Sequence, residues 1–118
     1  MNESTWIELG RQNSDRMSRA QLTYFLSMSA LTATIVFSNA GDFALLLTVT
    51  AVLTALYGIL TFDAAQQTFI RMSHSMPESI ASTPVGVAVR EVKQYQFYRA
   101  TNVLFSAGIA AVQIIAIN

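Results

Sequence analysis

The sequence contains no cysteine, and it has one histidine and two prolines among its 118 residues. The absence of cysteine excludes disulfides and thiolate chemistry, and it argues against zinc and iron–sulfur sites. His74 is the single histidine, and one imidazole alone does not build a metal site. The chain therefore lacks the side chains on which thiol-dependent and most metal-dependent enzymes rely.

Charged residues are also scarce. They make up 12% of the chain, with seven basic and seven acidic side chains that cancel, against roughly 25% in soluble domains. The sequence has no basic patch of the kind that binds nucleic acid. It also has no catalytic triad, paired-carboxylate site or phosphate-binding loop. We therefore expect neither an enzyme nor a partner of nucleic acid.

Apolar residues are abundant and make up 53% of the sequence. They gather in three runs, at about 21–37, 43–62 and 100–117. Each run approaches the roughly 20 residues that a helix needs to cross a hydrocarbon core about 30 Å thick. Residues 1–118 are therefore predicted to form a single domain, an all-α integral membrane protein with three transmembrane helices in a lipid bilayer.

The segments around these runs carry their own signals. The polar stretch Ser38–Asp42 is a tight turn, which predicts that the first two spans form an antiparallel hairpin. Residues 1–20 are polar but carry Trp6 and Ile7, which suggests a short amphipathic helix at the membrane interface.

A second amphipathic pattern precedes the third run. Apolar side chains recur there at the spacing of one helical face, at Val85, Ala88, Val89, Val92 and Tyr95. This spacing predicts an interfacial helix over about 85–98 that leads into the third span.

The basic residues fall in two regions only, before the first span and between the second and third: Arg11, Arg16, Arg19, Arg71, Arg90, Lys93 and Arg99. Three spans place these two regions on the same side of the membrane. By the positive-inside rule, the N-terminus is expected in the cytoplasm, with the hairpin turn and the C-terminus outside. The corresponding location is the inner, cytoplasmic membrane.

The second span carries small residues four positions apart, namely Thr50, Thr54 and Gly58 in one row and Ala51 and Ala55 in another. Such rows let helix backbones approach closely, which drives helix packing inside lipid. The rows are suited either to packing within the chain or to assembly as a homo-oligomer or within a larger membrane complex.

The third span carries a polar stripe formed by Arg99, Asn102, Ser106 and Gln113. At 100° per residue these four side chains fall within about 60° of one another on a helix. Polar groups cost free energy in lipid, so the stripe should face protein, water or an ion path. Three arrangements satisfy this requirement: hydrogen bonds to the first two helices, a water-filled path, or contact with another subunit.

Two titratable residues follow the second span, Asp63 and His74. We expect Asp63 to be solvated at the membrane edge and His74 to be ordinary polar surface.

The order of the stripe resembles the third helix of microbial (type I) rhodopsins. That family has an arginine, an aspartate or asparagine three residues later, a serine or threonine four further on, and an acid or glutamine after seven more. Here these positions are Arg99, Asn102, Ser106 and Gln113. Asparagine together with glutamine is similar to the sodium- and chloride-pumping branches. The resemblance implies that Asn102 lies near the retinal Schiff base, Arg99 guards the outer half-path and Gln113 faces the inner half.

Residues 27–37 and 47–54 also look like the first two helices of that family, in order. The pattern departs from the family at Ala100, Val103 and Gly108, where the family has tyrosine, tryptophan and proline. The lysine of the seventh helix is missing, so retinal would be a cofactor only if a lysine-bearing partner completed the fold. The charge distribution also favours the opposite orientation. The resemblance therefore implies a fragment, a split half or a retinal-free derivative.

Two functional hypotheses follow. The first is ion translocation or its remnant, with the stripe as the polar path. The second is a non-catalytic accessory subunit or a small homo-oligomeric membrane protein, in which the stripe is a packing surface.

Overall fold

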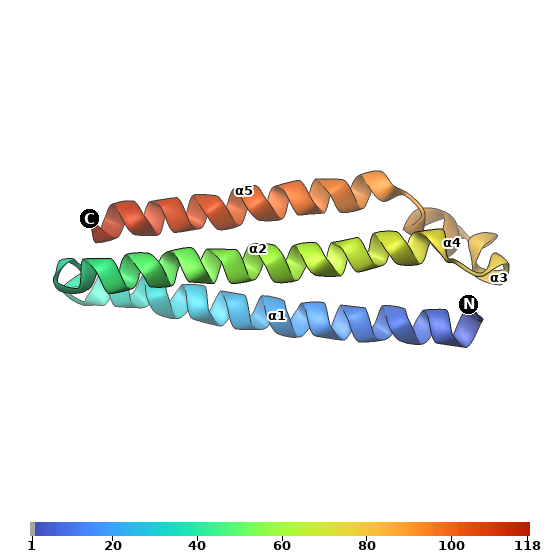
Figure 1. The fold of residues 1–118 in the computed structure, drawn as a ribbon, viewed down its shortest axis with the longest axis horizontal. Coiled ribbons are helices and arrows are strands. Elements are labelled where there is room, and N and C mark those ends of the chain that lie inside the picture. Colours follow the sequence, from blue (N-terminus) through green and yellow to red (C-terminus); the bar gives the residue numbers. More distant parts are fainter. Residues whose placement is uncertain (1) are drawn as a thin grey trace.

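The computed structural model describes residues 2–118, and every regular element in that range is helical. Three long helices dominate (Figure 1): α1 (Glu3–Phe37), α2 (Ala44–His74) and α5 (Val92–Ile117). A short 3₁₀ turn, η1 (Ala40–Phe43), joins α1 to α2. Two short helices, α3 (Glu78–Ala81) and α4 (Pro84–Val89), lie between α2 and α5.

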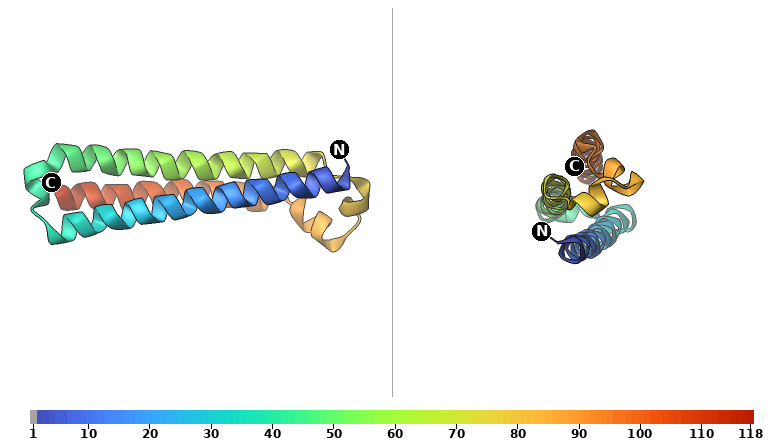
Figure 2. Two further views of the ribbon diagram at one scale, coloured as in Figure 1. Left: turned by 90° about the horizontal axis from the view of Figure 1, so that it is seen from below. Right: turned by 90° about the vertical axis from the view of Figure 1, so that its right-hand side faces the viewer.

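Helix α2 lies between α1 and α5 and packs along both of them, whereas α1 and α5 touch each other little. The two views in Figure 2 show the same arrangement from the side and from the end. The N-terminus, α3 and α4 lie at one end of a rod of 59 × 22 × 18 Å, and η1 and the C-terminus lie at the other. The predicted antiparallel hairpin of the first two spans is present.

All three long helices are long and apolar enough to cross a membrane. In the most apolar 18-residue stretch of each helix, only 11%, 17% and 22% of the residues are buried within the chain. Large apolar side chains such as Leu26, Leu45, Leu104 and Ile115 face outward. Helices whose apolar side chains point away from the protein are suited to contact with lipid. The all-α class and the three helices of spanning length are thus confirmed.

Small side chains allow α1 and α5 to approach α2 closely. Ala51 is 1% exposed and belongs to a core cluster with Leu31, Leu47 and Ile117. At Gly58 an added Cβ would lie 2.7 Å from a ring carbon of Tyr24, a distance that real Cβ atoms do not tolerate. The aromatic ring of α1 therefore packs directly on the glycine backbone of α2.

Helix α1 is longer than the sequence suggested, because it begins at Glu3 and not near residue 21. Its 35 residues span about 52 Å, which exceeds the hydrocarbon core by roughly 20 Å. The expectation of a separate short helix within residues 1–20 is wrong, because these residues continue into the first long helix. Trp6 is buried against α2, where its Nε1 donates to the carbonyl oxygen of Met72 at 2.9 Å.

The predicted helix over 85–98 is also corrected. Helix α4 ends at Val89 and α5 begins at Val92, so the second half of the predicted segment is the first part of the third long helix. Two side chains of α5 explain the break: Gln94 Nε2 donates to the Ala88 carbonyl at 2.8 Å, and the Tyr95 hydroxyl donates to the Val89 carbonyl at 3.0 Å. These bonds satisfy the last carbonyls of α4, so the chain can turn there.

The contact at Gly58 gives a stability prediction. Gly58→Ala forces its new methyl group against the Tyr24 ring, so we expect destabilisation of roughly 1–3 kcal/mol despite the higher helix propensity of alanine. Gly108→Ala is the matched control, because a Cβ at Gly108 meets nothing within 4 Å. Unfolding in detergent, followed by circular dichroism, measures both. Equal stability of the two variants would contradict the described packing.

Candidate functional site

The polar stripe of α5 faces the interior of the three-helix unit. Ser106 is 3% exposed and Gln113 is 7% exposed, while Arg99 and Asn102 are half-buried. The four predicted residues therefore lie on one helix face, as the spacing indicated, and this face is directed at α2 and α1.

The first stripe residue forms an ion pair with α2. Arg99 Nε lies 2.5 Å from Asp63 Oδ1, and Arg99 Nη2 lies 3.4 Å from Oδ2. Gln67 Nε2 donates to the same Asp63 Oδ2 at 2.8 Å, and Arg99 Nη1 donates to Gln96 Oε1 at 3.2 Å. The arginine and aspartate side chains are 30% and 24% exposed. The expectation that Asp63 is merely solvated is therefore wrong.

A sequence signal for this pair was available. Asp63 directly follows the second apolar run, and Arg99 directly precedes the third. Antiparallel neighbours place the end of one run beside the start of the next, so the two charges meet at the same level. The pair cancels both charges at the border of the apolar layer, where an isolated charge would be costly.

The next two stripe residues lie against the α2 backbone. Asn102 Nδ2 lies 3.4 Å from the carbonyl oxygens of both Gly58 and Ile59. Ser106 Oγ donates to Asn102 Oδ1 at 3.4 Å. The asparagine amide thus links α5 to α2, and the serine supports it from one turn further along.

The last stripe residue reaches the other neighbouring helix. Gln113 Nε2 donates to Thr32 Oγ1 at 3.0 Å and approaches the Met28 carbonyl oxygen at 3.4 Å, both on α1. All four stripe residues therefore have hydrogen-bonding partners within the chain. Together they connect α5 to both of the other long helices.

The predicted small-residue rows of α2 are partly buried and partly exposed. Ala51, Ala55 and Gly58 are buried, whereas Thr54 is half-buried. Thr50 is exposed, and its hydroxyl donates to the Leu46 carbonyl of its own helix at 2.8 Å. The buried members of both rows thus serve packing within the chain.

A pocket of about 300 Å³ lies beside the stripe, between α1, α2 and α5. Its walls carry aromatic side chains, namely Tyr24, Phe25, Phe62, Tyr98 and Phe105, and Asn102 and Ser106 also line it. The pocket exists because α1 and α5 both pack on α2 and leave space between themselves. Its walls are mostly apolar, and its polar groups are amides and hydroxyls.

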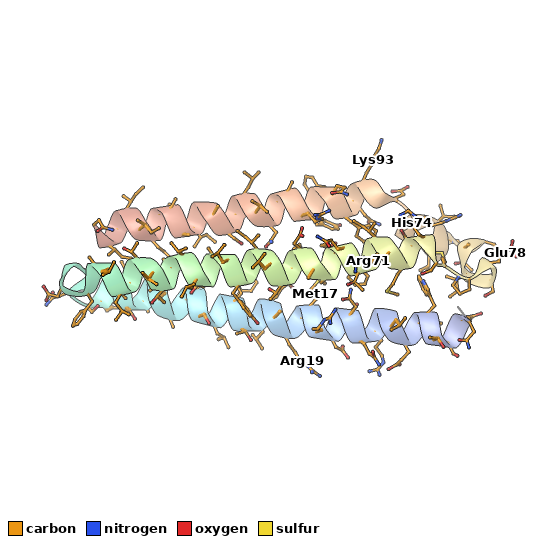
Figure 3. The ribbon with its side chains drawn as sticks, viewed as in Figure 1. Met17, Arg19, Arg71, His74, Glu78 and Lys93 are labelled. Carbon is orange, nitrogen blue, oxygen red and sulfur yellow. The ribbon has the colours of Figure 1, made fainter. Side chains whose placement is uncertain are left out.

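No group of three or more histidine or acidic side chains among residues 2–118 is placed to hold a metal ion. His74 is exposed at the end of α2, near α3 and α4 (Figure 3). The geometry brings together polar groups that can hydrogen-bond and neutralise charge, and the stripe faces neighbouring helices.

Comparison with family models, curated proteins and solved structures gave no match to this chain. The resemblance to microbial rhodopsins thus rests on the residue pattern alone.

The Arg99–Asp63 pair can be tested by a double-mutant cycle. Asp63→Asn leaves a half-buried guanidinium without its counter-charge, and Arg99→Gln leaves the carboxylate alone. We expect each single change to cost about 1–2 kcal/mol of stability. The double variant should lose less than the sum, because it removes both charges. Unfolding in detergent supplies the four stabilities, and strictly additive losses would show that the two charges are not coupled.

Proposed function

We propose that this chain is a non-catalytic three-span membrane subunit that acts through association with other membrane chains, including its own copies. In this proposal the polar stripe is a packing surface that fixes α5 against α2 and α1. The single observation that supports it best is that Arg99, Asn102, Ser106 and Gln113 all have partners within the chain.

The competing proposal is ion translocation or its remnant, and its support is the rhodopsin-like order of the same four residues. An ion path needs polar groups that can exchange their partners for water or an ion. Ser106 and Gln113 are almost fully buried, and they are bonded to neighbouring side chains. These contacts favour the packing role.

Association is supported by a further row of small residues, which lies on α5. Ala107 and Ala111 are four residues apart and exposed, and Gly108 lies beside them with open space around it. Small residues on an outward helix face let a neighbouring helix approach closely within a bilayer. This row, Ala107–Ala111, is the proposed association face.

The proposed orientation places the N-terminus in the cytoplasm, in the inner membrane, and the C-terminus outside. Its support is the position of the basic residues. All seven lie before the first apolar run or between the second run and the start of the third, on segments in the N-terminal half of the rod (Figure 1). The hairpin turn and the C-terminus carry none.

The packing role predicts the effect of removing the stripe's amides. Asn102→Leu combined with Gln113→Leu should lower stability by about 1–4 kcal/mol, because each amide loses interhelical bonds worth roughly 0.5–2 kcal/mol. Thr50→Leu is the control, since Thr50 is exposed and bonds only to its own helix. Unfolding and ion flux are measured on the same reconstituted samples. Unchanged stability with a lost ion flux would refute the packing role.

The association face can be tested by disulfide crosslinking, because the native chain has no cysteine to interfere. Ala107→Cys and Ala111→Cys should form crosslinks in native membranes, either to a second copy or to a different chain. Leu53→Cys is the control, on an outward-facing position of α2. Crosslinking at Ala107 and Ala111 no stronger than at Leu53 would contradict association through this face.

A further inference from the structure

A second cavity lies in a groove that α1 and α2 form by themselves. It encloses about 460 Å³, and its α1 side runs from Arg16 and Arg19 to Thr23. Its α2 side runs from Ala65 to Tyr57. No α5 residue lines it, so the groove lies apart from the polar stripe, and Thr61 is the lining residue that it shares with the aromatic pocket.

The groove crosses the border of the apolar layer. Arg16 and Arg19 precede the first apolar run, which begins near residue 21, while Thr23 and Tyr57 lie inside the first and second runs. From Arg16 to Thr23 the helix rises about 10 Å. One end of the groove is thus cationic and lies at the border of the apolar runs. The other end extends between the two runs, where Thr23, Tyr57 and Thr61 line it.

Arg16 is held in place by a neutral side chain. Its Nη2 donates to Asn13 Oδ1 at 3.2 Å, and Asn13 Nδ2 donates in turn to the Ala65 carbonyl oxygen at 3.1 Å. Asn13 is only 3% exposed, so this link is rigid. Because the partner is an amide, it orients the guanidinium at the edge of the groove without cancelling its charge.

Neither arginine of the groove has a carboxylate partner within 4.0 Å in the part of the chain that the structure describes. The acids nearest in sequence are committed elsewhere on α1, since Glu8 and Asp15 both pair with Arg11. The side chain of Arg19 extends away from the helices (Figure 3). Arg16 thus presents its charge at the groove, and the exposed Arg19 side chain has to turn toward the groove to meet an anion at the same end.

The geometry points to a binding site for an anionic phospholipid in this groove, an inference that rests on the membrane location proposed above. Arg16 and Arg19 hold the headgroup phosphate, because guanidinium groups form strong, directed hydrogen bonds to phosphate oxygens. The glycerol and the first part of an acyl chain lie along Thr23, Tyr57 and Thr61. Cationic grooves between helices on the cytoplasmic side are suited to anionic headgroups.

The lipid assignment is favoured over free phosphate by the shape of the groove. A free anion would occupy only the arginine end. The remaining length, between Thr23 and Tyr57, lies within the apolar runs, and its hydroxyl groups and aliphatic walls are suited to the glycerol ester region and the start of an acyl chain.

The experiment uses the full chain purified in a neutral detergent. Its thermal unfolding is measured while short-chain phosphatidylglycerol, the matching phosphatidylcholine, or inorganic phosphate is titrated in. We expect phosphatidylglycerol to stabilise the native chain most strongly. Arg16→Gln combined with Arg19→Gln should lose roughly 25-fold of the preference for phosphatidylglycerol, because each arginine contributes roughly fivefold.

The matched control is Arg71→Gln combined with Lys93→Gln, which removes the same charge from exposed positions outside the groove. This control should keep the native preference. Equal stabilisation by the two lipids, or an equal loss in the control, would overturn the site. Stabilisation by inorganic phosphate as strong as that by phosphatidylglycerol would overturn the lipid assignment.

Failure of the site is distinguishable from failure of the membrane proposal. Alkaline extraction of native membranes tests membrane residence by itself, since an integral protein stays in the pellet. A chain that is retained there but shows no lipid preference refutes the groove alone. A chain that is released refutes the membrane location and, with it, the lipid site.

Discussion

A polar side chain on an apolar helix needs a partner, and in the proposed membrane location this requirement explains how the three long helices of this chain are arranged. Arg99 meets Asp63, Asn102 meets the backbone of α2 near Gly58, and Gln113 meets Thr32 on α1. Lipid offers no hydrophobic incentive for helices to pack, so hydrogen bonds and close backbone approach decide which faces meet. The stripe supplies the hydrogen bonds, and the small residues of α2 supply the close approach.

Close approach of the helix backbones explains why α2 lies between α1 and α5. Its small residues Ala51, Ala55 and Gly58 are buried among the neighbouring helices. Beyond the apolar layer, α2 continues beside the polar half of α1. There Asn13 and Trp6 donate to the carbonyl oxygens of Ala65 and Met72. The two helices thus remain joined outside the apolar layer as well as within it, and the groove with Arg16 lies where these two regions meet.

The sequence alone predicts the three apolar runs, the hairpin turn and the common face of the stripe, because these depend on local hydrophobicity and on helix periodicity. It does not predict that α1 extends back to Glu3. Residues 3–20 are mostly polar, so they carry no continuous apolar face that would indicate packing against another helix. The periodicity of apolar residues also does not predict the break between α4 and α5. It depends on Gln94 and Tyr95 reaching the carbonyls of Ala88 and Val89, and such contacts exist only after the chain has folded back. The Arg99–Asp63 pair could have been predicted, because antiparallel packing of the second and third spans brings the two charges together.

In the proposed function the stripe is a packing surface and not part of a water-filled path. The accessibility of a cysteine at Ser106 tests it most directly, because the native chain has no thiol of its own. Ser106→Cys in native membranes should resist a water-soluble thiol reagent, while Gly41→Cys in the exposed hairpin turn should react readily. Labelling of the Ser106→Cys variant at a rate close to that of the turn variant would show that water reaches the stripe, and it would contradict the packing account.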